Sequence, residues 1–301
     1  MATTSIVEII RRGVEMGASD IHITVFRPPT YRINGKLTTF PEDEILKGED
    51  TGRLGEELIP NPKVRRELEE NGQADFSNSF AGIGRVRVNL YVQRGSYAIA
   101  IRLIPVNVPS LGNLGLPPVV KELAMKDKGL ILVTGPTGSG KSTTLAAMID
   151  MLNHSRNANI LTLEDPIEYL HRHGTCVINQ REVGTDTNSF AMGLRAALRQ
   201  DPDIILVGEM RDLETIATAI SAAETGHFVM STVHTVTAAQ TIDRIIDSFP
   251  PHQQHQVRAQ LANILQAIVC QQLLPSMDGI EIIPAFEILL VNDAARNLIR
   301  E

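Results

Sequence analysis

Residues 129–145 read GLILVTGPTGSGKSTTL, which is an apolar run, a glycine-rich turn and then residues that favour a helix. The turn Gly135–Ser142 matches the pattern G-x-x-x-x-G-K-S/T in full, and that pattern is specific when a strand precedes it and a helix follows it. In such a turn the backbone N–H groups curl around phosphate oxygens, and the N-terminus of the helix adds positive potential. The stretch therefore predicts a binding site for a nucleoside triphosphate.

The residue types of this turn indicate individual roles. We expect Lys141 to reach the outer phosphates and to act in catalysis, and we expect the Ser142 hydroxyl to ligate Mg²⁺. The predicted cofactors are therefore ATP and Mg²⁺. The predicted nucleotide contacts in this segment are Gly135, Pro136, Thr137, Gly138, Ser139, Gly140, Lys141, Ser142 and Thr143.

From residue 129 onward, apolar strand-like runs alternate with helical stretches. This alternation is typical of a mostly parallel sheet with helices on both faces, so the predicted fold class is α/β. Helices are predicted at 141–152 and 213–223. The predicted strands are 130–134, 160–163, 204–207 and 228–232.

The first part of the chain has a different pattern. It opens with a predicted amphipathic helix, after which the residues alternate as in strands. Prolines and glycines concentrate over residues 105–118, which predicts a linker. We therefore expect one domain at 1–104 and a second at 119–301. The apolar residues spaced for one face of the first helix are Ile6, Ile9, Ile10 and Val14.

An acidic residue follows the predicted strand 204–207, at the edge where open α/β sheets bind ligands. In the usual second motif of nucleotide-binding proteins an Asp would stand at the position of Gly208, so Glu209 is the one carboxylate at the end of this strand. We expect Glu209 to lie near Mg²⁺ or its water shell.

Three more carboxylates, Glu164, Asp165 and Glu168, follow the predicted strand 160–163. A P-loop enzyme needs a group that orients or deprotonates the attacking water, and these residues are candidates for it. The spacing does not rank Glu168 above Glu164, and a solvated acidic turn is the alternative.

Two histidines flank the predicted strand 228–232, with His227 before it and His234 after it. A lone histidine is more often structural than functional. The placement at the ends of a sheet strand keeps a second role open, which is to sense the γ-phosphate by hydrogen bonding. We treat His227 as a candidate for nucleotide binding and His234 as a candidate for catalysis.

Residues 84–92 alternate between two faces, with the arginines on one and the apolar residues on the other. If the next run pairs with them across a turn at 93–96, Arg87 lies opposite Arg102. Like charges directly opposite each other destabilise a sheet, and an anion would relieve that cost. We predict that Arg85, Arg87 and Arg102 meet a phosphate or carboxylate, including as arginine fingers across a subunit boundary. The alternative is that they pair with acids of their own domain.

Composition and charge exclude several classes of protein. The chain is 43% hydrophobic and 21% charged, which is typical of a globular protein, and no apolar run approaches the roughly 18 residues of a membrane span. The net charge is −7, and all of the acidic excess lies after residue 112, so nucleic-acid binding is not expected. The two cysteines cannot form a four-cysteine zinc site, and we expect them to be buried thiols in the cytoplasm.

Several segments, in this order, resemble the secretion ATPase superfamily of type II secretion and type IV pilus systems, and within it the pilus retraction ATPases. The resemblance covers nearly the whole chain. The matching segments are 17–22 (GASDIH), 135–144 (GPTGSGKSTT), 163–168 (LEDPIE), 201–212 (DPDIILVGEMRD), 223–227 (AETGH) and 231–235 (STVHT).

The resemblance implies a PAS-like α+β N-terminal domain, a RecA-like ATPase domain and a ring of six subunits. It assigns the water-activating role to Glu168 and a Walker B role with Mg²⁺ to Glu209, and it supports the three arginines as nucleotide contacts. Family members continue past the position of Glu301 with further helices, which we expect to be absent here.

By this resemblance the chain is expected to be an ATP-hydrolysing motor that powers pilus retraction, and hence twitching motility, through pilin disassembly. The implied partners are a membrane platform protein and, as a further candidate, the pilus assembly ATPase. The implied location is the cytoplasmic face of the inner membrane.

Three alternatives stay open. Pilus assembly and type II secretion ATPases usually carry a long N-terminal extension and a four-cysteine metal module, so the two cysteines favour retraction. A RecA-like nucleic-acid translocase is disfavoured by the low aromatic content of 4%, which leaves few stacking platforms. A regulatory nucleotide switch without turnover would differ from a motor in its steady-state phosphate release.

Overall fold

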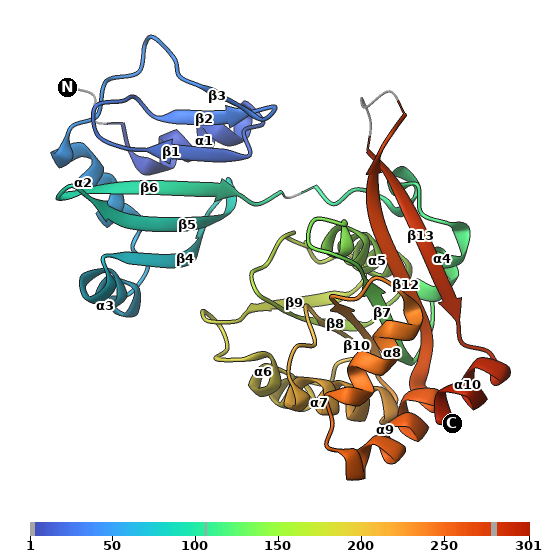
Figure 1. Ribbon diagram of the computed structural model, residues 1–301. Coiled ribbons are helices and arrows are strands. Elements are labelled where there is room, and N and C mark those ends of the chain that lie inside the picture. The colour runs from blue at the N-terminus through green and yellow to red at the C-terminus, as the bar shows by residue number, and fades with distance from the viewer. Residues whose placement is uncertain (1–3, 106, 278–281) are drawn as a thin grey trace. The chain divides into compact units, whose positions relative to one another are not determined.

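The computed structural model describes residues 4–105, 107–277 and 282–301 (Figure 1). The chain divides into two compact units, residues 1–106 and 107–301. Each unit has its own hydrophobic core, and each is described by itself.

The first unit is an α+β structure built on one antiparallel sheet, with the strand order β3-β2-β1-β6-β5-β4. Its helices are α1 (Ile6–Glu15), α2 (Gly48–Leu58) and α3 (Pro62–Asn71). Its strands are β1 (Asp20–Ile23), β2 (Thr30–Ile33), β3 (Lys36–Thr38), β4 (Gln73–Phe80), β5 (Gly84–Gln93) and β6 (Ser96–Leu103).

Helix α1 begins at a capping box, in which Ser5 and Glu8 each accept a hydrogen bond from the other's backbone N–H. The helix was predicted from its apolar spacing, and its three isoleucines are buried as expected. The prediction for Val14 was wrong, because its side chain is 44% exposed. Gly13 faces the core instead, and a Cβ there would lie 2.7 Å from Ile21, so the helix packs closely against the sheet at that point.

The second unit has a seven-stranded sheet in the order β13-β12-β7-β11-β10-β8-β9, parallel throughout except for the edge strand β13. The strands are β7 (Gly129–Thr134), β8 (Asn159–Glu164), β9 (Val177–Glu182), β10 (Ile204–Val207), β11 (Phe228–Val233), β12 (Leu265–Pro275) and β13 (Ile282–Leu290). The helices are η1 (Leu111–Leu114), α4 (Pro118–Ala124), α5 (Lys141–Ser155), α6 (Phe190–Ala197), α7 (Leu213–Glu224), α8 (Ala238–Asp247), α9 (Pro251–Ile264) and α10 (Asp293–Arg300).

Helices cover both faces of this sheet (Figure 1). Alternate residues of each buried strand enter different cores: Leu130 and Leu132 of β7 pack with α6 to α10, whereas Ile131 and Val133 pack with α4 and α5. Because both faces are covered, the central strands are apolar throughout. The predicted α/β class and the four predicted strands are confirmed.

The structure adds strands that the sequence did not indicate, namely β9, β12 and β13 in the second unit. The stretch 105–118, predicted as a linker, contains η1 and the first residue of α4. Within it, Leu111 and Leu116 pack against the core of the second unit. The boundary between the units accordingly falls at residues 106 and 107, at the beginning of that stretch.

Candidate functional site

The glycine-rich turn leaves β7 at Thr134 and enters α5 at Lys141. It runs close to β12: a Cβ at Gly135 would lie 2.2 Å from the Gln271 carbonyl oxygen, and one at Gly140 would lie 2.7 Å from Gln271 Nε2. Both glycines also have positive φ values, 145° and 86°, at which other residues are strained. Only glycine fits these two positions, which explains why the sequence pattern requires glycine at both.

The Lys141 side chain is folded back onto the turn. Its Nζ donates hydrogen bonds to the carbonyl oxygens of Gly135 and Pro136, both at 2.9 Å. Burial lowers the pKa of Lys141, while the nearby carboxylates of Glu209 and Glu168 act in the opposite direction. A single ammonium group is therefore within electrostatic reach of both acids that the sequence singled out.

The first turn of α5 is tied to β12 by a buried hydrogen bond. Thr144 Oγ1 donates to Gln271 Oε1 at 2.7 Å, and the two residues are 1% and 5% exposed. Gln271 thus supports both the glycine-rich turn and the helix that follows it.

A cavity of about 510 Å³ opens beside the turn, within the usual size range of small-molecule sites. The segments that line it are the turn and α5, the residues that follow β8, and the carboxyl ends of β10 and β11. The predicted site residues among its lining are Thr137, Gly138, Gly140, Lys141, Ser142, Thr143, Glu168, Glu209 and His234.

Some predicted contacts do not line this cavity. Gly135 and Ser139 are buried within the turn, and Pro136 is exposed on it. The structure also contradicts the placement of His227 in the nucleotide site of its own chain. Its carbonyl accepts from the N–H of Gly129, the first residue of β7, so it lies at the amino ends of the strands, opposite the turn.

Glu209 is held in a small charged cluster. Its Oε1 lies 2.5 Å from Nε of Arg211 and 3.2 Å from Nε2 of His234. The side chain is only 16% exposed, whereas those of its partners are 69% and 41% exposed. The structure thus brings together two residues that the sequence singled out separately, Glu209 and His234, and adds Arg211 to them.

The preceding glycine explains why the acid comes one position later than in the usual motif. The Gly208 N–H donates to the carbonyl of Leu163 at 2.7 Å, and its own carbonyl accepts from Thr232 Oγ1 at 2.7 Å. A Cβ at Gly208 would lie 3.1 Å from that Leu163 oxygen. There is little room for a side chain, so the following residue carries the carboxylate.

The two glutamates after β8 have different surroundings. Glu164 Oε1 accepts from Thr162 Oγ1 at 2.6 Å and from Gln180 Nε2 at 3.1 Å. Burial raises the pKa of Glu164, although these hydrogen bonds oppose the shift. Glu168 is exposed on the cavity wall and makes no ion pair within the described part of the chain. The geometry thus distinguishes a held acid from an accessible one, which the spacing did not.

Residues 3–280 match the family described as "Type II/IV secretion system protein". The chain belongs to that family. It is 45% identical to the "Type IV pilus retractation ATPase PilT" of Pseudomonas aeruginosa over 98% of this chain and 85% of that protein. It is 43% identical to the "Twitching motility protein" of Neisseria gonorrhoeae, over 99% of this chain and 79% of that protein.

A solved structure described as the "Pilus Retraction Motor PilT and Bound ADP" superimposes on this one with a TM-score of 0.91. It is 52% identical in sequence, and the match covers 99% of this chain and 86% of that chain. This secretion ATPase accordingly has a RecA-like nucleotide-binding unit preceded by an N-terminal domain, as the sequence predicted.

Sequence reasoning missed two polar residues that line the cavity of this secretion ATPase and one that lies against its glycine-rich turn. Arg211 follows Glu209 by two residues, and that proximity was a signal available in the sequence. Tyr169 directly follows Glu168, and its hydroxyl lies 3.0 Å from Thr143 Oγ1. Gln271 carried no signal, because it reaches the turn from a strand that the sequence did not indicate.

In the first unit, the predicted pairing of β5 with β6 is confirmed, with Arg87 opposite Arg102. The turn has two residues, Arg94 and Gly95, with φ values of 50° and 77°, where four were predicted. Arg102 Nε lies 3.0 Å from Asp20 Oδ1. For Arg102 the alternative of an ion pair with an acid of its own unit therefore holds in this structure.

The other two arginines of this secretion ATPase differ from each other. Arg85 is half-buried, and its Nη1 donates to Ser79 Oγ at 3.4 Å. Arg87 is exposed and has no ion pair within residues 4–105, 107–277 and 282–301. Of the three, Arg87 is the most available for an outside anion.

None of the helices in residues 4–105, 107–277 and 282–301 is both long and apolar enough to cross a membrane. These residues also contain no group of three or more His, Cys, Asp or Glu side chains placed to hold a metal ion.

Proposed function

We propose that this secretion ATPase is a subunit of a hexameric ring that hydrolyses ATP to power retraction of type IV pili, which underlies twitching motility. Similarity to the pilus retraction ATPase of Pseudomonas aeruginosa and to the twitching motility protein of Neisseria gonorrhoeae supports retraction. One feature of the site carries the proposal of turnover: the Lys141 ammonium, the accessible Glu168 and the clustered Glu209 surround one cavity at the glycine-rich turn. A turn that only bound nucleotide, without hydrolysing it, would not need an accessible acid such as Glu168 near Lys141.

In this proposal the turn binds the phosphates of ATP through its backbone N–H groups, and Lys141 contacts the outer phosphates. Ser142 and Glu209 direct a hydroxyl and a carboxylate into the same cavity, and such oxygen ligands are those that Mg²⁺ prefers. These residues fit a magnesium site that is completed by phosphate oxygens and water. When bound, Mg²⁺ neutralises charge on the phosphates.

Glu168 is proposed to orient the attacking water and to accept its proton, because it lines the cavity and makes no ion pair in the part of the chain that the structure describes. Glu164 is less suited, since its Oε1 already accepts hydrogen bonds from Thr162 and Gln180. His234 sits beside Glu209 and is proposed to sense the γ-phosphate by a hydrogen bond.

Arg85, Arg87 and Arg102 are proposed to stabilise the charge that develops on the γ-phosphoryl group, from the same or a neighbouring subunit. Changes in the nucleotide site would then move the second unit against the first around the segment after residue 104. We propose that this motion is passed to a platform protein at the cytoplasmic face of the inner membrane, which removes pilin subunits. The pilus assembly ATPase is a further proposed partner.

The test of the chemistry is phosphate release by the full chain with ATP and Mg²⁺. Glu168→Gln is expected to retain ATP binding and to lose about 10²- to 10⁴-fold in turnover, the usual contribution of a general base. Glu224→Gln, at the end of α7 and outside the cavity lining, serves as the control and should keep its turnover. Unchanged turnover in Glu168→Gln would remove the proposed role of this residue.

The test of the biological role is complementation. The chain is expressed in a piliated strain that lacks its retraction ATPase, and twitching motility is measured. The active chain should restore twitching and Glu168→Gln should not. Turnover that rises when DNA is added, without restored twitching, would favour a nucleic-acid translocase instead.

A further inference from the structure

The segment that carries Glu168 lacks regular secondary structure. Residues 165–176 lie between β8 and β9 and form neither helix nor strand. A segment of this kind has no backbone ladder to fix it, so its hydrogen bonds must come from elsewhere. In this protein they come largely from side chains of β9 and α5.

Strand β9 supplies the support nearest to Glu168. Gln180 Nε2 donates to the carbonyl of Tyr169 at 2.9 Å, and Gln180 Oε1 accepts from the N–H of His171 at 2.8 Å. The two ends of one amide group thus hold the backbone one and three residues after Glu168. Two residues along the strand, Glu182 Oε2 accepts from the N–H of Ile167 at 3.0 Å.

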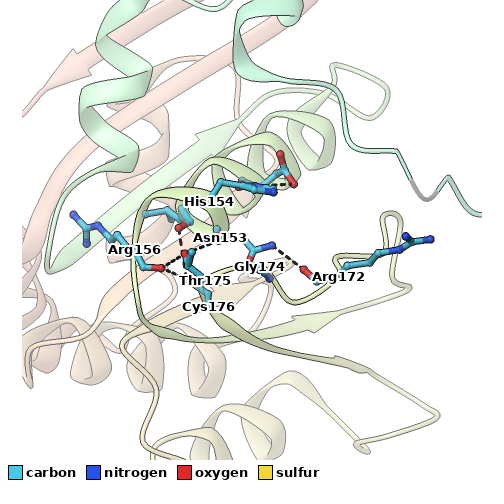
Figure 2. A network of polar contacts seen from close by, with 9 residues as sticks. Asn153, His154, Arg156, Arg172, Gly174, Thr175 and Cys176 are labelled. Carbon is cyan, nitrogen blue, oxygen red and sulfur yellow. Dashed lines mark hydrogen bonds and ion pairs between the residues drawn. The ribbon is translucent and has the colours of Figure 1, made fainter.

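Helix α5 holds the far end of the segment (Figure 2). Asn153 Nδ2 donates to the carbonyl of Arg172 at 2.7 Å, and Asn153 Oδ1 accepts from the N–H of Gly174 at 2.9 Å. The backbone carbonyl oxygen of Asn153 accepts hydrogen bonds from the N–H and the hydroxyl of Thr175, both at 2.9 Å. Asn153 is 2% exposed, and a Cβ at Gly174 would lie 2.7 Å from its carbonyl oxygen, so the contact is close.

These contacts make the position of Glu168 depend on a residue outside the cavity lining. Gln180 is not part of the cavity lining and makes no hydrogen bond to the turn within the described residues, yet it fixes the backbone on the carboxyl side of Glu168. Its amide also donates to Glu164, the last residue of β8, so Gln180 holds the end of the strand as well as the segment that follows it. A catalytic group that is misplaced by about 1 Å can lose about 100-fold in rate.

We propose that Gln180 is a positioning residue for Glu168, and that Asn153 is a second anchor of the same segment with a smaller effect. The inference rests on the proposed water-activating role of Glu168. Gln180 acts through the backbone of Tyr169 and His171 and lies outside the cavity lining. The glycine-rich turn has its own support from β12, so loss of the Gln180 amide should leave ATP binding intact.

The experiment compares Gln180→Met, Glu168→Gln and the double variant in the full chain. Gln180→Met is expected to lower kcat by about 10- to 100-fold and to leave the ATP dissociation constant within about twofold. In the Glu168→Gln background the same change should lower single-turnover phosphate release no further, because its effect passes through the missing carboxylate. Asn153→Leu should lower kcat less than Gln180→Met does.

Two readouts separate positioning from general damage. Hydrogen–deuterium exchange should accelerate at the His171 amide in Gln180→Met, while the amides of β7 keep their protection. The control is Asn159→Leu, which removes an amide that holds the carbonyls of Gln200 and Asp201 at the other end of the sheet, and kcat should be unchanged. If Gln180→Met does not fold, Gln180→Asn, which is one methylene shorter, should show the same loss of kcat.

An unchanged kcat in Gln180→Met or Gln180→Asn would overturn the inference. An equal further loss in the Glu168→Gln background would overturn it too, since Gln180 would then act independently of Glu168. Failure of the proposed function looks different. In that case Glu168→Gln alone keeps its turnover.

Discussion

The buried hydrogen bond between Thr144 and Gln271 allows a quantitative test of how the nucleotide site is supported. Gln271→Met removes the acceptor and leaves the Thr144 hydroxyl, 1% exposed, without its observed partner. Leaving a buried polar group unsatisfied costs about 1–3 kcal/mol. For a unit of this size each kcal/mol lowers the Tm by about 2–4 °C, so a fall of about 2–12 °C is expected.

The assay is thermal unfolding followed by circular dichroism, applied to a double-mutant cycle. Thr144→Val should give a loss of similar size, because it leaves the Gln271 amide without its donor. The double variant should be at least as stable as either single variant, since replacing both partners by apolar groups removes the unsatisfied atom. Gln272→Met changes the neighbouring residue of β12, which is half-buried, and should alter stability by about 0.5 kcal/mol or less.

The result that would refute this reasoning is additivity. If the Tm loss of the double variant equals the sum of the two single losses, the side chains do not share an interaction. A loss in Gln272→Met as large as that in Gln271→Met would also show that the effect belongs to the strand and not to the hydrogen bond.

Two further predictions concern the first unit. Separate Ala variants of Arg85, Arg87 and Arg102 should lower steady-state phosphate release, and the exposed Arg87 should give the largest loss. Arg102→Ala should also lower the stability of the unit, because it removes the ion pair with Asp20. Unchanged turnover in all three variants would discard their catalytic role. Burial raises the pKa of Tyr31 to about 12 from its ordinary 10.0, so the folded state favours the neutral phenol. The neutral phenol therefore contributes to the free energy of unfolding in full below about pH 10. That stability should be lost as the pH rises from about 10 to about 12, and urea unfolding of Tyr31→Phe should lack this dependence; an identical pH profile in both proteins would contradict the assignment.

The parts of the fold that could be predicted are those whose signals are local. The glycine-rich turn was recognisable because backbone geometry at Gly135 and Gly140 admits no other residue. The central strands were recognisable because burial on both faces makes them continuously apolar. Both signals are contained within about ten residues of sequence.

The parts that could not be predicted depend on distant contacts. Strand β9 has the sequence VINQRE, in which polar residues prevail, and two of them, Gln180 and Glu182, hold the loop that precedes it. Strand β12 follows α9 without a break, so its apolar residues read as part of one run. Gln271 lies 127 residues from Thr144 in the sequence, and no local pattern connects them.

The sequence itself contains the information needed to place His227 away from the nucleotide site. Ligands of open α/β sheets bind at the carboxyl ends of the strands, and His227 comes before its strand and not after it. Direction along the strand therefore separates His227 from His234, which follows the strand and lines the cavity. The ranking of Glu168 above Glu164 had no such signal, because it depends on which carboxylate finds hydrogen-bond donors in the folded chain.

The contacts of the Lys141 ammonium with two carbonyls of its own turn have a consequence for the rate of nucleotide capture. A free lysine side chain has about 1.5–2 kcal/mol of rotamer freedom to lose when it is immobilised. Here that freedom is already lost on folding, so an incoming phosphate meets a charge that is already in place. Arrival of the ligand then requires only an exchange of acceptors and no search by the side chain.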